Sequence, residues 1–161
     1  MLTLLQGASP HLFRRKAAMD AGRVMLEKIH SLGQRGADFG FETTLSGRTY
    51  IKLFRDLKKR GYQIHIFLLW LGSIKLALER IETRVKHGGH DIPEAIVRRR
   101  FDRSLSNFFE FYKPLAESWT IFDNSGDVPK VVAFEESGKL EIIDPQAYSF
   151  ILRQGRRNGK K

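Results

Sequence analysis

The sequence predicts an α/β domain in which helices cover a mostly parallel sheet in three layers. Three observations support this fold class: strands and helices alternate along the chain, the most apolar run is continuous, and a helix pair precedes a C-terminal hairpin. Strands that are separated by helices form right-handed crossovers, and these crossovers produce parallel sheets. At 161 residues the chain is long enough for one domain with a core.

The first half of the chain predicts two helices, each followed by a strand. Apolar residues recur every three or four positions over 14–32, which predicts an amphipathic helix that stops at Gly33. Residues 38–45 predict a short strand, and 50–60 predict a helix capped by Ser46 or Thr49. Tyr62–Leu71, YQIHIFLLWL, is almost entirely apolar and predicts a strand that is buried on both faces.

The second half predicts a helix pair, a strand and a hairpin. Ser73 is a suitable cap for the first helix, and Asp91-Ile92-Pro93-Glu94 resembles a capping box at the start of a longer helix over 93–115. Residues 119–124 predict a strand, and 130–134 with 140–143 predict a hairpin. We therefore expect one domain over 1–150 and a basic, disordered tail over 151–161.

Charge and composition narrow the possible partners. The net charge of +10 and the pI near 10.1 favour an anionic partner, which can be a nucleic acid, a nucleotide or a phosphorylated substrate. The chain has no cysteine, which excludes disulfides and thiolate metal sites. There is no apolar run of membrane-spanning length and no signal peptide pattern, so we expect a cytoplasmic protein without a membrane partner.

The stretch FETTLSGR places polar groups at the predicted end of a strand. Ligands bind at the carboxyl ends of strands in parallel sheets. Glu42 can accept a proton from a substrate hydroxyl, while Thr43, Thr44 and Arg48 can bind sugar or phosphate oxygens. A helix-capping loop with an exposed glutamate fits the same residues equally well.

Arginines gather on the two helices of the pair. Arg80 and Arg84 are four residues apart, as are Arg99 and Arg103, so each pair shares one helical face. Two cationic helices joined by a glycine-rich turn can close on a polyphosphate. A solvated basic face, partly balanced by nearby acidic residues, is the alternative.

Two shorter motifs are ambiguous. His87-Gly88-Gly89-His90-Asp91 contains metal-ligating residue types, but no further ligands recur at a recognised spacing, so we expect a hinge and no metal site. Asp123-Asn124-Ser125-Gly126 follows a predicted strand and can either touch a ligand base or simply close the strand as a polar turn. The phosphate-binding pattern G-x-x-x-x-G-K-[ST] does not occur in the sequence.

The segments FETTLSGRTYIKLFRDLKKRGYQIHIFLLWL and LALERIETRVKHGGHDIPEAIVRRRFDRSLSNFFEFYKPLAESWTIFDNSG closely resemble the zeta-toxin-like group of P-loop kinases, from about Asp20 to Gly126. The resemblance implies a three-layer P-loop kinase fold with a helical lid. It also implies ATP or GTP with magnesium as cofactor, and a sugar-nucleotide hydroxyl as phosphate acceptor, as in characterised members that phosphorylate UDP-N-acetylglucosamine.

The resemblance implies three groups of site residues. The acceptor side corresponds to Glu42, Thr43, Thr44 and Arg48. The neutralisation of charge during phosphoryl transfer corresponds to Arg84, Arg99 and Arg103. The nucleotide side corresponds to Arg80, Arg100, Asp123, Asn124 and Ser125.

The resemblance also implies parts that this sequence does not contain. Family members begin with a strand, a phosphate-binding loop and its helix, so we expect an N-terminally shortened domain that is inactive alone. Loss of that strand predicts an open sheet edge, where an antitoxin-like chain or a second copy can bind. A basic nucleic-acid-binding module is a further alternative, although the aromatic residues of the long helix follow a core stripe, so a nucleic-acid partner is disfavoured.

Overall fold

The computed structural model describes residues 10–158 and divides the chain into two compact units, Met1–Glu42 and Thr43–Lys161. The first unit contains helix α1 (Pro10–Gln34), which passes the predicted stop at Gly33. The left-handed residue that follows the helix is Gly36, with φ of 68°. The predicted strand over 38–45 is not formed, because a strand needs a pairing partner and Leu45 has φ of 52°, outside the strand region.

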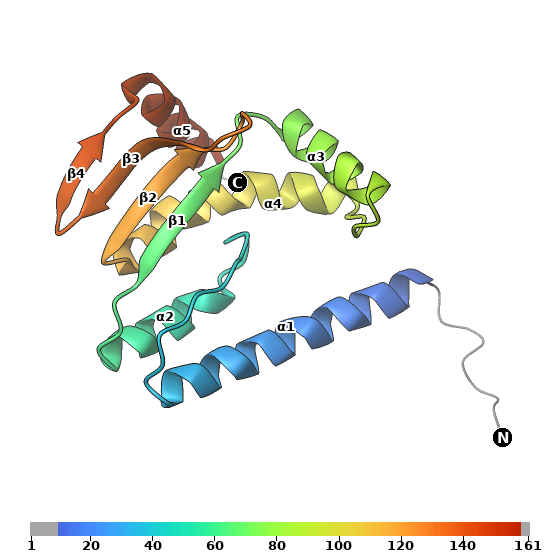
Figure 1. Ribbon diagram of the computed structural model, residues 1–161, viewed down its shortest axis with the longest axis horizontal. Helices are drawn as coiled ribbons and strands as arrows, with labels where there is room; N and C mark the ends of the chain where they lie inside the picture. The colour runs from blue at the N-terminus through green and yellow to red at the C-terminus, as the bar shows by residue number, and fades with distance from the viewer. Residues whose placement is uncertain (1–9, 159–161) are drawn as a thin grey trace. The chain divides into compact units, whose positions relative to one another are not determined.

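The second unit, over its described residues, contains a four-stranded sheet and four α-helices (Figure 1). Its elements are α2 (Thr49–Lys59), β1 (His65–Trp70), α3 (Ile74–Lys86), α4 (Glu94–Asn107), a π-helical turn (Phe108–Tyr112), a 3-10 turn (Lys113–Leu115), β2 (Ser118–Asp123), β3 (Lys130–Glu136), β4 (Lys139–Ile142) and α5 (Pro145–Asn158). The predicted order is confirmed from α2 to the β3–β4 hairpin. The tail that was expected from 151 begins inside α5, which continues to Asn158.

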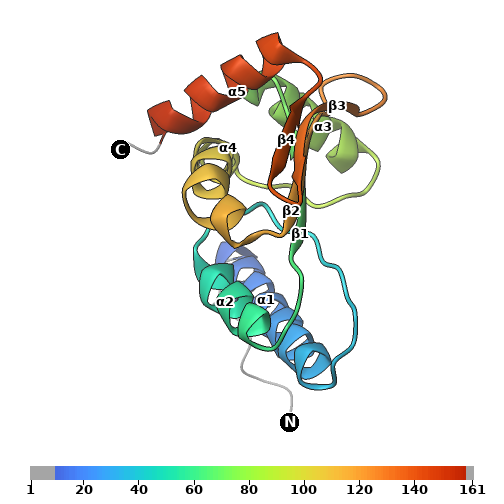
Figure 2. The same cartoon turned by 90° about the vertical axis from the view of Figure 1, so that its left-hand side faces the viewer.

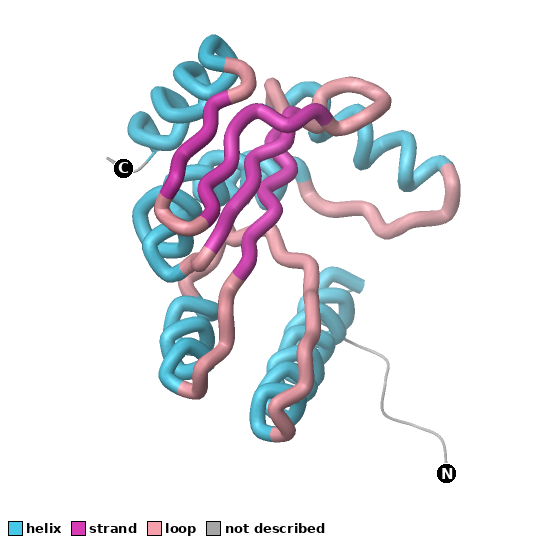
Figure 3. The backbone as a smooth tube through the Cα atoms, turned by 60° about the vertical axis from the view of Figure 1, so that its left-hand side comes forward, coloured by secondary structure: helices cyan, strands magenta, loops and turns pink. Residues whose placement is uncertain are grey.

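The sheet has the order β1-β2-β3-β4, and Figure 3 shows the four strands side by side. Only the β1–β2 pair is parallel, whereas β2–β3 and β3–β4 are antiparallel. The prediction of a mostly parallel sheet is therefore wrong. The reason is that short connections follow β2 and β3, and a short connection joins antiparallel strands; Ser137 and Gly138, with φ of 52° and 75°, form the second turn.

Helices α4 and α5 lie on one face of the sheet (Figure 2). The core is made by side chains on that face and on the helices, all 7% exposed or less: Ile66, Val97, Leu105, Phe108, Tyr112, Trp119, Ile121, Ala133, Tyr148 and Ile151. On the opposite face Phe67 and Leu69 are 70% and 57% exposed. The prediction that β1 is buried on both faces is wrong, because its alternate residues Phe67 and Leu69 are exposed on the second face. The three-layer arrangement stays a prediction.

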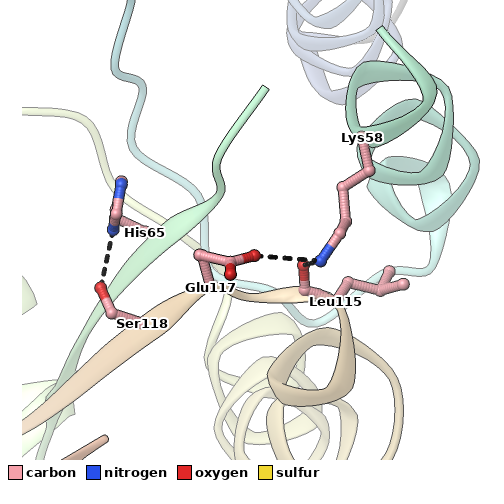
Figure 4. Close-up of polar contacts among 5 residues, drawn as sticks. All are labelled: Lys58, His65, Leu115, Glu117 and Ser118. Carbon is pink, nitrogen blue, oxygen red and sulfur yellow. Dashed lines mark hydrogen bonds and ion pairs between the residues drawn. The ribbon is translucent and has the colours of Figure 1, made fainter. Parts of the chain in front are cut away.

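Polar contacts lie at the start of the parallel pair β1–β2, some from helix α2 and one between the two strands (Figure 4). Lys58 on α2 donates a hydrogen bond to the carbonyl oxygen of Leu115 at 3.1 Å and lies 3.5 Å from the carboxylate of Glu117. His65 and Ser118 are register partners, and Nδ1 of the histidine lies 2.7 Å from the serine hydroxyl. These contacts hold the parallel register, which sets where the carboxyl ends of β1 and β2 meet.

Of the two caps predicted for helices α3 and α4, one is confirmed. The Ser73 hydroxyl accepts a hydrogen bond from the backbone N–H of Leu76 at 3.2 Å, which confirms the predicted cap of α3. Helix α4 begins after Pro93, and no side chain caps it. Across residues 10–158, every helix is too short or too polar to span a lipid bilayer.

Candidate functional site

The carboxyl ends of the parallel strands β1 and β2 carry two loops that are hydrogen-bonded to each other. The backbone N–H of Asn124 donates to the carbonyl oxygen of Trp70 at 2.8 Å. The backbone N–H of Gly72 donates to the hydroxyl of Ser125 at 2.9 Å, and the N–H of Ser125 donates to the Asp123 carboxylate at 2.9 Å. The turn after β2 is therefore ordered by its own polar side chains, at the edge where parallel sheets bind ligands.

Helix α3 contacts this turn through one arginine. Arg80 donates a hydrogen bond from Nη2 to the carbonyl oxygen of Gly126 at 3.0 Å. The structure thus brings together four of the five residues predicted on the nucleotide side, namely Arg80, Asp123, Asn124 and Ser125. The fifth, Arg100, lies half-buried on α4, and the structure records no side-chain contact for it with this turn.

The turn between α3 and α4 is packed around Arg84. Its Nη2 donates to the carbonyl oxygen of His90 at 3.2 Å. Gly88 has φ of 83°, and a Cβ on Gly89 would lie 2.6 Å from Cγ of Arg84, so both glycines are needed for this shape. Among the described residues there is no group of three or more His, Cys, Asp or Glu side chains arranged to hold a metal ion.

Two arginines of α4 carry charge without an acidic partner. Arg99 and Arg103 are exposed, and within residues 10–158 neither forms an ion pair. Arg98 differs, since its Nε donates to the Glu94 carboxylate at 2.7 Å. We call Arg99 and Arg103 the arginine stripe. Like charges on one helical face repel each other, and a bound anion would relieve that repulsion.

The segment Thr43–Arg48, which we call the hydroxyl loop, opens the second unit. The hydroxyls of Thr44 and Ser46 lie 2.9 Å apart, and the Thr43 hydroxyl accepts a hydrogen bond from the N–H of Leu45 at 3.3 Å. The Arg48 guanidinium makes a cation–π contact, with its Cζ 4.1 Å from the ring centroid of Phe111. Glu42 is exposed and is the last residue of the first unit.

Two residues that hold the hydroxyl loop were missed by the sequence analysis. Nδ2 of Asn107 donates a hydrogen bond to the carbonyl oxygen of Leu45 at 2.9 Å. The Tyr112 hydroxyl donates one to the carbonyl oxygen of Gly47 at 2.6 Å. Burial raises the pKa of Tyr112, and the charge of Tyr50 adds to the rise, although a backbone hydrogen bond from Tyr50 lowers it. The phenol therefore stays protonated and remains a donor. The available signal was an amide and a phenol on a helix face otherwise predicted as core.

The arginine stripe and the hydroxyl loop lie along one side of α4. Residues 99, 103 and 107 are four positions apart, so they share a helical face. Each is about 6 Å from the next along the helix axis. Asn107 contacts the loop directly, and Arg103 lies about one turn away from it. A phosphate bound at the stripe and a hydroxyl held by the loop would therefore be neighbours.

Comparison with known proteins places the chain in a family. A family model described as zeta toxin matches residues 8–146. The chain belongs to the zeta toxin family. This zeta toxin family chain is also 36% identical over 87 residues to an uncharacterized protein of Haemophilus influenzae. The matched part is 54% of this chain and 62% of that relative, so the match covers less than two thirds of the relative. No solved structure matches it.

Membership of the zeta toxin family indicates a kinase-like type of domain. The described residues fit part of a nucleotide: the ordered turn with Arg80 can face a base, and the unpaired arginine stripe suits phosphates. Among residues 10–158 no group of three or more His, Cys, Asp or Glu side chains is arranged to hold an ion, so a magnesium ion would have to be held by one or two side chains together with nucleotide phosphates. The roles predicted for individual site residues stay predictions.

Proposed function

We propose that this chain carries the acceptor side and the lid of an ATP- or GTP-dependent phosphotransferase that acts on a hydroxyl of a sugar nucleotide. The observation that supports this most is the arrangement along α4. The arginine stripe, which is exposed and has no acidic partner, lies on the helical face that continues to Asn107 and the hydroxyl loop. A phosphotransferase needs such a pairing of cations and hydroxyl-binding groups.

Each predicted residue has a role in this proposal. Thr43 and Thr44 orient the acceptor sugar, with Glu42 as the carboxylate that receives the proton of the attacking hydroxyl. The ordered turn Asp123-Asn124-Ser125 lies beside the base, and Arg80 braces that turn from α3. Arg84, Arg99 and Arg103 neutralise phosphate charge as the lid closes, with Arg100 beside them and Arg48 on the acceptor side.

The proposal assigns no step to magnesium, which in kinase sites is held largely by substrate phosphates and water. The sequence also contains no G-x-x-x-x-G-K-[ST] loop, which in P-loop enzymes cradles the β- and γ-phosphates. We therefore expect the 161-residue chain to bind a polyphosphate weakly and to transfer no phosphate by itself. Micromolar affinity for ATP with magnesium would refute this expectation.

The experiment is a calorimetric titration with inorganic tripolyphosphate at low ionic strength. We expect measurable binding to the wild type and at least a tenfold loss of affinity in the double variant Arg99→Gln/Arg103→Gln. The matched control is Arg98→Gln, which removes one charge from the same helix but from a residue already paired with Glu94; it should stay within about twofold. Equal losses in both variants, or no binding by the wild type, would contradict the proposal.

The alternative of a nucleic-acid-binding module is disfavoured by burial. Phe108 and Tyr112, two aromatic residues of the long helical segment, are 0% exposed and offer no stacking surface to bases. A titration with single-stranded DNA and RNA separates the two functions. The module requires affinity that falls steeply with salt, and the absence of binding to single strands at low ionic strength would exclude it.

A further inference from the structure

The hydroxyl loop contains a strained residue at its centre. Leu45 has φ of 52°, which places a bulky non-glycine residue in the left-handed region, and its side chain is only 6% exposed. Such a conformation persists only where surrounding contacts enforce it, and it is found mainly at functional sites. Nearby contacts must therefore hold Leu45 in this conformation.

Two hydrogen bonds flank the strained residue. The carbonyl oxygens of Leu45 and Gly47 each accept one bond, from Asn107 and Tyr112 respectively. Asn107 is 6% exposed and Tyr112 is 0% exposed, so water does not compete for these donors. Both bonds are made to backbone oxygens, which leaves the hydroxyls of Thr44 and Ser46 at the surface.

The π-helical turn Phe108–Tyr112 explains how both donors reach one loop. In a regular α-helix, residues five apart point about 140° away from each other around the axis. A π turn bonds residue i to i+5, as the N–H of Lys113 bonds to the carbonyl of Phe108, and so brings such positions to nearly the same side. The irregular turn is therefore what lets Asn107 and Tyr112 hold the loop together.

We propose that Asn107 and Tyr112 are positioning residues which hold the hydroxyl loop in its strained form and couple it to the arginine stripe. The coupling rests on the proposed function, in which the stripe binds phosphate and the loop orients the acceptor. Arg103 precedes Asn107 by one helical turn, so an anion bound at the stripe would further stabilise the part of α4 that carries the donors. Phosphate binding thereby prepares the loop for its acceptor.

The test is backbone hydrogen exchange of the full chain, measured with and without inorganic tripolyphosphate. The variants are Tyr112→Phe, which removes one oxygen, and Asn107→Leu, which has a similar shape, adds no charge and removes the donor. The matched control is Tyr148→Phe, which removes the hydroxyl of a tyrosine that is 7% exposed on α5, at a distance in sequence from the loop. Tripolyphosphate affinity is measured for every protein by calorimetry.

We expect tripolyphosphate to slow exchange in residues 44–48 at least fivefold in the wild type and in Tyr148→Phe. In Tyr112→Phe and Asn107→Leu this protection should be lost, while tripolyphosphate affinity changes by less than about twofold, since neither substitution adds or removes a charge near the stripe. Protection that persists in both variants, or a wild type that binds tripolyphosphate without any protection of the loop, overturns the coupling and leaves the proposed function standing. A wild type that does not bind tripolyphosphate overturns the proposed function itself.

Discussion

The hydroxyl of Ser125 accepts a hydrogen bond from the backbone N–H of Gly72 at 2.9 Å, and this bond joins the loops that follow the two parallel strands. The same serine donates its own N–H to Asp123, so it is held from both sides. Because Gly72 precedes the cap of α3, the bond also fixes where α3 begins. Helix α3, which is proposed as the first arm of a lid, is thus anchored to the sheet on the side where the nucleotide is proposed to lie.

Replacing Ser125 should loosen this anchor. We expect Ser125→Ala to lower the free energy of unfolding by about 1 kcal/mol, because the N–H of Gly72 loses its partner in a half-buried place. The measurement is urea denaturation followed by tryptophan fluorescence. Ser149→Ala, at an exposed position of α5, is the control and should change stability by less than about 0.5 kcal/mol. An equal effect of both substitutions would show that the hydrogen bond contributes nothing.

The packing of α5 on α4 depends on Gly155. A Cβ at this position would lie 2.7 Å from Cδ2 of Phe109, so Gly155→Ala must displace the ring or the helix. We expect a loss of about 1–3 kcal/mol of stability, as for other overpacked cores. Gly126→Ala is the control in the same unit, since a Cβ there meets nothing within 4 Å. Thermal unfolding compares the two, and a stable Gly155→Ala variant would mean that α5 does not pack as described.

Much of the fold could be predicted from periodicity and caps. The order of elements from α2 to the β3–β4 hairpin, and the serine cap of α3, follow from local patterns that the structure confirms. Strand direction is decided by the length of a connection and not by the pattern inside a strand, and the short connections after β2 and β3 were visible in the sequence. A continuous apolar run such as that of β1 is also the same for a central strand and for an edge strand.

The candidate site was predictable only in part. Arg80 and the turn after β2 were expected to lie together, and they do, because parallel strands bring their carboxyl ends to one edge. Asn107 and Tyr112 were not identified, since their role depends on a π turn and on a left-handed Leu45 that no spacing rule reveals. An amide and a phenol on a helix face that is otherwise predicted as core are the one feature of the sequence that could have indicated them.

The edge of the sheet allows a test of self-association. Among the described strands β1 pairs only with β2, and Phe67 and Leu69 expose apolar surface beside the free edge. We expect Leu69→Lys to reduce concentration-dependent association in light scattering while changing stability by less than about 0.5 kcal/mol. Val128→Lys, in the loop after β2, places the same charge at a residue that is 70% exposed. If both variants reduce association equally, the added net charge explains the reduction, and association through the β1 edge is contradicted.

Alkaline pH should destabilise the second unit through two buried tyrosines. Burial raises the pKa of Tyr112 and of Tyr148 above the ordinary value of 10.0, and the charge of Glu135 adds to the rise at Tyr148. Above pH 10.0 the unfolded chain releases these protons while the folded chain retains them, so the unfolded state binds fewer protons and the free energy of unfolding falls as pH rises. The stabilisation is complete below that pH and is lost as pH rises through the folded pKa values.

The measurement is urea denaturation at a series of pH values on both sides of 10.0, with tyrosinate absorbance recorded on the folded protein. Tyr148→Phe should make the alkaline decline shallower without affecting the hydroxyl loop, because its phenol is not bonded there. Tyr112→Phe should make the decline shallower too, but from a lower starting stability, since Gly47 loses its donor. An unchanged alkaline slope in both variants would show that neither phenol is buried as the structure describes.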